Sequence, residues 1–262
     1  MPKFAANLSF LFQDIDFFER FAASAECGFE AVEYLFPYDY APEKIKQALT
    51  ANGLTQALFN LPPGDWDAGE RGLAALPGRE AEFRGAVAQA GDYAEALGCA
   101  QVHAMAGIVP EGADPAPYEE IYVANLKYAA DYFAARGIRT LIEPLNSFDM
   151  PNYLLNGTKQ ARRIIEAVGS DNLYLQYDAY HLQIMEGNLA HSFERDLDII
   201  SHVQIAGVPG RFEPSVGEIN YPYLFALFDR LGYDGWIGCE YRPAGETRAG
   251  FGWAREYGIR AG

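Results

Sequence analysis

The sequence predicts an α/β protein folded as a closed (β/α)8 TIM barrel. Two observations carry this prediction: short apolar runs alternate with amphipathic helical patterns along the chain, and there are eight such runs. Strands that alternate with helices form parallel sheets, and barrels of about 250 residues routinely fold as one domain. The open doubly wound alternative lacks its signature, because no G-x-G-x-x-G turn opens the first helix and no P-loop is present. We therefore expect one barrel domain over residues 1–262.

The strand candidates are recognised by their apolar character and by the glycines that precede most of them. These glycines fit helix C-caps, where a left-handed backbone is needed; they are Gly28, Gly53, Gly98, Gly137, Gly169 and Gly232. The eight runs lie within residues 4–10, 26–36, 52–61, 97–107, 136–146, 168–178, 200–208 and 231–241.

The segments between these runs predict the helices. Their apolar residues recur every three or four positions, which is typical of amphipathic helices. The patterns cover residues 16–26, 43–51, 82–97, 124–135, 159–168 and 223–231. Two longer loops, 61–79 and 206–221, have a length that often forms lids or binding loops in compact domains.

Composition narrows the class of function. Acidic residues number 36 against 20 basic ones, a formal net charge of −16, so a phosphate backbone is repelled and nucleic acid is not an expected partner. No apolar stretch approaches the roughly 20 residues of a membrane helix. The N-terminal residues show no signal-peptide pattern, which favours a cytoplasmic protein. The three cysteines are widely spaced and fit small buried hydrophobes rather than a disulfide framework.

Four apolar runs in the second half end on side chains that bind metals: Glu143, Asp178, Gln204 and Glu240. They are spaced 26 to 36 residues apart, close to the roughly 30 residues of a strand-helix-strand unit. In a barrel, the carboxyl ends of the strands form the functional face. Burying an unpaired carboxylate costs several kcal/mol, so converging acids call for a cation. We expect one metal site built from the four strand ends.

The chemistry of this set favours Mg²⁺ or Mn²⁺, because its donors are all oxygens. A divalent ion there would polarise the carbonyl of an α-hydroxycarbonyl compound and stabilise an enediolate. Glu143 and Glu240 belong to different strands, so they are expected to face the substrate from two sides and to act as a proton-transferring pair.

Three further residues are predicted to contact the substrate. His181 lies three residues after Asp178, just past a strand end, and is placed to hydrogen-bond a substrate hydroxyl or to orient a ligand. His103 lies near the end of the fourth strand candidate and is a weaker candidate for the same pocket. Arg211, in the loop 206–221, is the best candidate to bind a substrate carboxylate, because its planar guanidinium matches that group bidentately.

Two other polar residues on strand candidates are expected to be structural. Glu33 is interpreted as an inward glutamate paired with an arginine, and it is left out of the metal set. His202 is expected to point away from Gln204, toward the helices.

Long stretches of the chain, in order and from end to end, resemble the hydroxypyruvate isomerase family of xylose isomerase-like barrels. The stretches are FAANLSFLF, AVEYLFPYDY, GDWDAGERGLAALPGRE, IEPLNSFDMPNYLL, LQYDAYHLQIMEGNL, HVQIAGVPGRFEP, GEINYPYLF and GWIGCEYRP. The resemblance implies that Glu143 and Glu240 transfer the proton and that Glu143, Asp178, Gln204 and Glu240 bind a divalent metal. By analogy with related ketose 3-epimerases, it implies that His181 and Arg211 contact the substrate. Relatives also imply a dimer or tetramer.

The resemblance leaves two substrates in competition. The stretch IEPLNSFDMPNYLL looks like hydroxypyruvate isomerase, whereas CAQVHAMAG and HVQIAGVPGR look more like 2-oxo-tetronate isomerases. Our first expectation is the isomerisation of hydroxypyruvate to 2-hydroxy-3-oxopropanoate (tartronate semialdehyde). The second is the same reaction on a 2-oxo-tetronate. The loop 206–221 departs from the family pattern, in which Gly207 is often Asp and Phe212 is often His.

Three other functions remain open at this point. One is a ketose epimerase on the same barrel, which would act on neutral sugars. Another is an abasic-site nuclease, which would need a basic groove and several histidines for zinc, whereas this chain has 4 histidines and a charge of −16. The last is a sugar-acid binding protein without catalytic activity.

Overall fold

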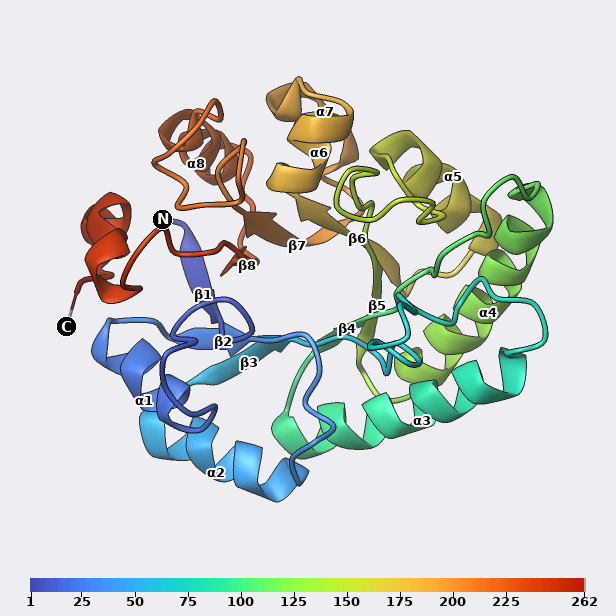
Figure 1. Ribbon diagram of the computed structural model, residues 1–262, viewed down its shortest axis with the longest axis horizontal. Coiled ribbons are helices and arrows are strands. Elements are labelled where there is room, and N and C mark those ends of the chain that lie inside the picture. Colours follow the sequence, from blue (N-terminus) through green and yellow to red (C-terminus); the bar gives the residue numbers. More distant parts are fainter. Residues whose placement is uncertain (262) are drawn as a thin grey trace.

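A computed structural model describes residues 1–261 of the chain and confirms the TIM barrel. Eight parallel strands follow one another in the order β3-β2-β1-β8-β7-β6-β5-β4. Figure 1 shows them inside an outer ring of helices. The strands are β1 (Lys3–Asn7), β2 (Ala31–Glu33), β3 (Thr55–Leu58), β4 (Gln101–His103), β5 (Arg139–Ile142), β6 (Leu173–Asp178), β7 (Ile200–Ile205) and β8 (Trp236–Cys239).

The barrel is nearly closed, and its weakest seam lies between β3 and β4. There the segments that follow β3 and end β4 meet in a single parallel bridge between Asn60 and His103. His103 N–H donates to the Phe59 carbonyl at 3.0 Å, and Leu61 N–H donates to the His103 carbonyl at 2.9 Å. These two bonds complete the ring at the end of the strands where the predicted site residues lie.

The helices cover the outside of the barrel. They are α1 (Glu19–Glu26), α2 (Pro42–Asn52), α3 (Glu80–Leu97), α4 (Ala116–Ala134), α5 (Thr158–Val168), α6 (Ala179–Met185), α7 (Leu189–Asp196) and α8 (Tyr221–Arg230), and a 3₁₀ helix η1 spans Arg248–Tyr257. Helix α4 starts well before the predicted 124–135 pattern, because its prolines stand at the first turn, where proline is compatible with a helix. All six glycines predicted to end helices have positive φ angles.

The sequence pattern did not predict α6, α7 and η1. Between α6 and α7, Gly187 and Asn188 both adopt positive φ angles, which breaks this segment into helices of 7 and 8 residues. Such short helices give little periodicity to detect. Helix α6 begins where β6 ends, because the Asp178 side chain accepts the Tyr180 N–H at 2.8 Å as an N-cap.

The barrel interior is unusually polar for this fold. Barrel interiors are commonly filled by branched aliphatic side chains, but here buried amides, acids and histidines occupy several strands: Asn7, Glu33, Gln56, Gln101, Gln176, His202, Gln204 and Glu240. The large apolar side chains pack in one cluster with those of the surrounding helices. These buried polar side chains include Gln204 and Glu240 of the predicted site.

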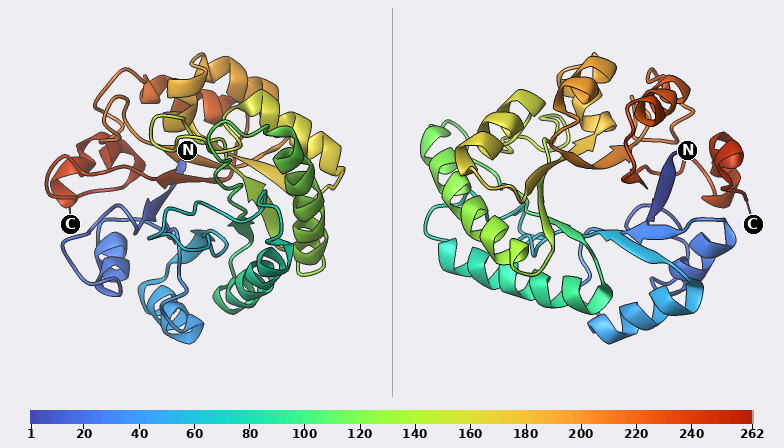
Figure 2. Two further views of the ribbon diagram at one scale, coloured as in Figure 1. Left: turned by 45° about the vertical axis from the view of Figure 1, so that its right-hand side comes forward. Right: turned by 180° about the vertical axis from the view of Figure 1, so that it is seen from behind.

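The two ends of the described chain lie on the same side of the barrel, near β1 and η1, as the two further views show (Figure 2). Within residues 1–261, no helix is both long and apolar enough to cross a membrane.

Candidate metal and catalytic site

The structure places the four predicted strand-end residues at one end of the barrel. Glu143 directly follows β5, Asp178 ends β6, Gln204 lies in β7 and Glu240 directly follows β8. All four side chains are buried. The parallel register sets Asp178 beside Gln204. Buried polar side chains from four neighbouring strands thus share the same face, which is the functional face of a TIM barrel.

Glu143, Asp178 and His181 form a buried group that could hold a metal ion. One potential ligand atom from each lies within 4.8 Å of the others. Glu143 Oε1 and Asp178 Oδ2 are both buried, and neither has a hydrogen-bond partner among residues 1–261. Buried polar atoms without partners are rare in proteins and call for an explanation such as a missing ion. Partnerless carboxylate oxygens on two members of this group fit a divalent cation.

The acids of the site have strongly raised pKa values. Burial raises the pKa of Glu143 well above its ordinary value, and the charges of Glu240 and Asp178 raise it further. Burial likewise raises the pKa of Glu240 to about 8 and that of Asp178 to about 6, although Arg211 opposes both shifts. Desolvation thus outweighs the single nearby guanidinium. A cation in the centre would reverse these shifts and keep the acids ionised.

Glu240 is joined to a second buried acid, Glu33, through two side-chain amides. Asn7 Nδ2 donates to Glu33 Oε1 at 3.0 Å and to Glu240 Oε2 at 2.9 Å. Gln204 Nε2 donates to the same two oxygens, at 2.9 Å and 2.6 Å. The expectation that Glu33 pairs with an arginine is therefore wrong: amides and a histidine surround it.

The expected orientation of His202 is also wrong. Residues two apart in a strand share a face, so His202 faces the barrel interior together with Gln204. Its Nε2 lies 2.6 Å from Glu33 Oε2, and its Nδ1 lies 3.2 Å from Gln101 Nε2. The alternation of side chains along the strand predicts this inward orientation, although not the partners of the ring.

Gln176 links the two halves of the site and was missed in the sequence. Its Nε2 donates to Glu143 Oε2 at 2.9 Å and to Gln204 Oε1 at 2.5 Å. Gln176 lies two residues before Asp178 on β6 and is completely enclosed. An inward polar residue one pleat below a strand-end acid is the signal that identifies it.

The hydrogen bonds of His181 and His103 place the ring proton on different nitrogens in the two imidazoles. His181 Nδ1 accepts the Asn146 backbone N–H at 3.1 Å, so a neutral ring carries its proton on Nε2, which lies 3.6 Å from Asp178 Oδ2. His103 Nδ1 faces two acceptors, Asn60 Oδ1 at 3.2 Å and Glu143 Oε2 at 3.5 Å, which places its proton on Nδ1.

Both rings are held in the neutral form by their surroundings. Burial lowers the pKa of His103 to about 3, and His202 adds to the shift. Burial also lowers the pKa of His181 well below its ordinary value, as do the charge of Arg211 and the neighbouring His103. His103 Nε2 is buried and has no partner among residues 1–261. It therefore offers a lone pair, whereas His181 Nε2 offers a proton.

Arg211 lies in the site but is already engaged. Its Nη2 donates to Glu240 Oε1, and its guanidinium carbon lies 4.8 Å from the Phe10 ring centre and 5.0 Å from that of Tyr180. Its backbone adopts a φ of 60°, an uncommon conformation for a non-glycine residue that points to a constrained position. Its ion pair with Glu240 leaves less of the guanidinium for a substrate carboxylate.

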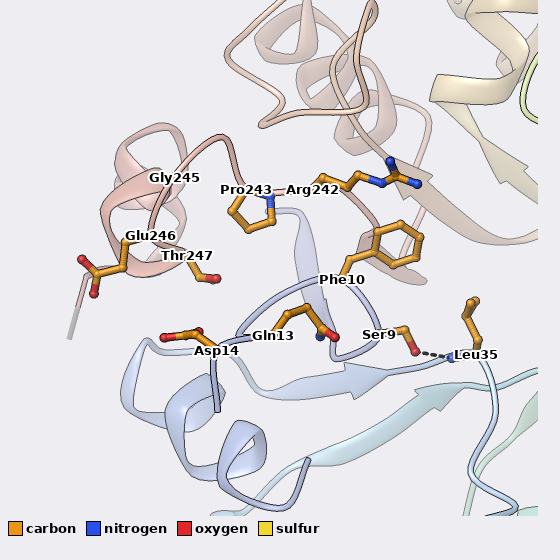
Figure 3. Close-up of a pocket in the computed structure, with 10 residues that line it drawn as sticks. All are labelled: Ser9, Phe10, Gln13, Asp14, Leu35, Arg242, Pro243, Gly245, Glu246 and Thr247. Atoms are coloured by element: carbon orange, nitrogen blue, oxygen red, sulfur yellow. Dashed lines mark hydrogen bonds between the residues drawn. The ribbon is translucent and has the colours of Figure 1, made fainter. Parts of the chain in front are cut away.

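A cavity of about 720 Å³ opens beside Phe10, between the loops that follow β1, β2 and β8. Figure 3 shows Arg242 and Phe10 on one side of it, with Asp14 and Glu246 at the opposite end. Arg242 is exposed, and its guanidinium makes no hydrogen bond or ion pair within residues 1–261. Its backbone N–H donates to the Arg211 carbonyl at 2.7 Å, so the two arginines are neighbours. No sequence pattern distinguishes Arg242 from other surface arginines.

Comparisons with known proteins agree with this fold. Residues 21–257 match the family model described as a xylose isomerase-like TIM barrel. The chain is 56% identical to a 2-oxo-tetronate isomerase of Cupriavidus necator, over 98% of this chain and 99% of that protein. It is 49% identical to a hydroxypyruvate isomerase of Escherichia coli, over 98% of this chain and 100% of that protein.

Solved structures show the same fold. A crystal structure from Brucella melitensis described as an AP endonuclease of family 2 superposes with a TM-score of 0.96 at 50% identity, covering 98% of this chain and 99% of that one. A D-psicose 3-epimerase of Clostridium cellulolyticum shares the fold, with a TM-score of 0.76 at 19% identity, covering 94% and 87% of the two chains. With these identities over its full length, the chain is an isomerase that belongs to the hydroxypyruvate isomerase and 2-oxo-tetronate isomerase family of xylose isomerase-like TIM barrels.

Proposed function

We propose that this enzyme isomerises a small 2-oxo acid and that a 2-oxo-tetronate is its preferred substrate. The sequence alone favoured hydroxypyruvate as the substrate. The identity of 56% to a 2-oxo-tetronate isomerase, against 49% to a hydroxypyruvate isomerase, favours the four-carbon acid instead. The observation that carries the chemistry is the pair of free, buried carboxylate oxygens on Glu143 and Asp178. Hydroxypyruvate is the second candidate.

The metal ligands we propose are Glu143, Asp178, Gln204 and Glu240. Their donors are all oxygens, which favours Mg²⁺ or Mn²⁺ over zinc. When bound, the ion would polarise the substrate carbonyl and stabilise negative charge on its oxygens. His181 is not placed in this set, because the Asn146 N–H on its Nδ1 leaves a proton on Nε2. Its role in the proposal is to donate a hydrogen bond to the substrate.

Glu143 and Glu240 are the proposed proton carriers. In either acid, a base removes the proton from C3, and a proton then returns to C2. Glu143 Oε1 has no partner, while Gln176 holds its Oε2. Glu240 is held by Arg211 on one oxygen and by two amides on the other. Burial raises the pKa of both acids and so opposes the effect of a bound cation, which favours their ionised forms.

The two histidines supply complementary contacts in this proposal. His181 Nε2 carries a proton and suits a substrate carbonyl or alkoxide oxygen. His103 Nε2 carries a lone pair and suits a substrate hydroxyl. A four-carbon acid carries one hydroxyl more than hydroxypyruvate, so a second polar contact of this kind supports the longer substrate.

The substrate carboxylate requires a cation, and the structure offers two. Arg211, which the sequence favoured for this role, already donates a hydrogen bond from its guanidinium to Glu240. Arg242 is free and lines the adjoining cavity. We propose that Arg242 takes the carboxylate while Arg211 stays with Glu240. Arg242→Gln should then raise the KM for the acid about tenfold with kcat retained, whereas Arg211→Gln should lower kcat; the reverse pattern would return the carboxylate to Arg211.

The test of substrate class is a comparison of kcat/KM for a 2-oxo-tetronate, hydroxypyruvate and a neutral ketose at one Mg²⁺ concentration. The proposal expects the order given, with the ketose turned over least. A higher value for hydroxypyruvate would restore the three-carbon acid as the substrate. A higher value for the ketose would identify an epimerase. The description of the Brucella melitensis structure names a nuclease. Two observations argue against that activity here: the net charge of −16 repels DNA, and the metal-binding group within residues 1–261 contains one histidine.

A further inference from the structure

We infer that Glu33 is a positioning residue: it decides which end of the Gln204 side-chain amide faces the metal site. The inference rests on the metal site proposed above, in which Gln204 binds through its oxygen. Glu33 lies on β2, on the opposite side of Gln204 from Gln176, and its side chain is almost completely buried.

A chain of hydrogen bonds beneath the site runs from Gln101 through His202 to Glu33. One backbone carbonyl determines which atoms in it donate and which accept. The Ala57 carbonyl, which can only accept, lies 3.1 Å from Gln101 Nε2. The same amide nitrogen donates to His202 Nδ1, so the His202 proton is on Nε2. That proton is donated to Glu33 Oε2 at 2.6 Å. One oxygen of Glu33 is thus held as an acceptor.

The other oxygen of Glu33 is held as an acceptor in the same way. The Ser9 backbone N–H, which can only donate, fixes Asn7 Oδ1 at 3.0 Å and so turns the Asn7 amide nitrogen inward. This nitrogen donates to Glu33 Oε1. Every neighbour of the Glu33 carboxylate is therefore a donor, and Gln204 must present its own donor, Nε2, to complete the arrangement.

The orientation of Gln204 follows from this arrangement. With Nε2 placed between Glu33 and Glu240, its Oε1 faces Gln176 Nε2 and keeps a lone pair for a metal ion. The flipped amide would set Oε1 of Gln204 against two carboxylates and its Nε2 against the amide nitrogen of Gln176. It would also present hydrogen atoms to the ion. Glu33 therefore acts on the metal through Gln204, without touching it.

The Glu33 carboxylate occupies space that is open only because residue 238 is glycine. A Cβ atom on Gly238 would lie 2.2 Å from Glu33 Oε1. Gly238 is in β8, beside Gln204 in the strand register and two residues before Glu240. The backbone of β8 thus closes directly over Glu33, which fits a carboxylate that must keep one position.

The experiment measures Mn²⁺ affinity by the electron paramagnetic resonance signal of free Mn²⁺, without substrate. Glu33→Gln is the central variant, because either orientation of the new amide sets an NH₂ group against a donor, His202 or Gln204. We expect a 10- to 100-fold loss of affinity, which is the usual effect of removing a partner of a metal ligand. Asp196→Asn is the matched control. It also removes a fully buried acid, which pairs with Arg162 and Arg195 away from the site, and it should keep the wild-type affinity.

A second background separates orientation from simple loss of charge. In Gln204→Glu, the side chain presents an oxygen in either orientation, so adding Glu33→Gln should cause no further loss and should relieve repulsion between the acids. If Glu33 acted only by its charge, the loss would be the same in both backgrounds. Should Glu33→Gln not fold, Gly238→Ala displaces the same carboxylate and should weaken Mn²⁺ binding as well.

The outcomes are distinct from those of the proposed function. If the wild-type chain binds no Mn²⁺, the metal site itself is refuted. If the wild type binds Mn²⁺ and Glu33→Gln binds it equally well, or loses affinity equally in the Gln204→Glu background, the positioning role of Glu33 is refuted while the metal site stands.

Discussion

Glu240 shows how single residues carry the chemistry of this site. Its Oε2 accepts two amide hydrogens, from Asn7 and Gln204, and its Oε1 accepts from Arg211. Burial still raises its pKa to about 8. Glu143, on the other side of Gln176, has one free oxygen and a pKa raised well above its ordinary value. Both residues combine a fixed position with an unusual readiness to hold a proton.

Glu143→Gln and Glu240→Gln should each lower kcat by roughly 10²- to 10⁴-fold, the range expected when a general acid or base is removed. Glutamine keeps the shape but removes the proton carrier and replaces a charged metal ligand with a neutral one. Both variants should remain folded, as circular dichroism can verify. Near-normal turnover in either variant would contradict the assignment of two glutamates.

The stability of the metal-free enzyme should depend on pH in the direction set by these acids. Glu240 and Asp178 have pKa values in the folded chain that are raised above those of the unfolded chain. The folded chain therefore binds more protons between about pH 4 and pH 8, and stability falls as pH rises through this window. His103 and His181, whose pKa values are lowered, act in the opposite direction up to the pKa of an unfolded histidine, about 6.5. Above that pH the acids dominate, so we expect a lower Tm at pH 8 than at pH 7 after chelation. Because a bound cation favours ionised ligands, added Mg²⁺ should raise the Tm more at pH 8 than at pH 7. A Tm that increases toward pH 8 without metal would contradict these shifts.

At the scale of elements, the loop 206–221 fixes Arg211 through a close backbone approach. A Cβ atom on Gly207 would lie 2.1 Å from the Val216 carbonyl oxygen, so the loop in this form has no room for a side chain there. Gly207 also accepts the Arg211 N–H at 2.9 Å and donates to the Phe212 carbonyl at 2.8 Å. Glycine at position 207 thus permits this closed form of the loop.

Gly207→Ala should therefore disturb the loop and the position of Arg211. The added methyl group forces a backbone shift, which in well-packed regions costs about 1–3 kcal/mol. We expect a lower Tm and reduced turnover. Gly245→Ala, where an added Cβ would meet open space, is the control for an exposed loop glycine. Equal Tm values for the two variants would show that the approach is not tight.

At the scale of the whole molecule, the strand-helix alternation and the strand-end residues could be read from the sequence. Both are visible in the sequence because the spacing of apolar residues and the ends of apolar runs depend only on neighbouring positions in the chain. The partners of Glu33, His202 and Gln176 could not, because these contacts join β2, β6 and β7 across the barrel. The free guanidinium of Arg242 also depends on which acids lie nearby in space. The sequence therefore predicted where the site lies better than how its residues are held.

Metal-dependent isomerisation of a 2-oxo acid can be followed by proton NMR of a 2-oxo-tetronate, and of hydroxypyruvate, in D₂O with the enzyme and Mg²⁺, before and after excess chelator. We expect isomerised product and loss of the C3 proton signal above the enzyme-free control, both stopped by chelator and restored by Mg²⁺. No product from either acid with folded, Mg²⁺-loaded enzyme, or product formation at an unchanged rate in chelator, would contradict it.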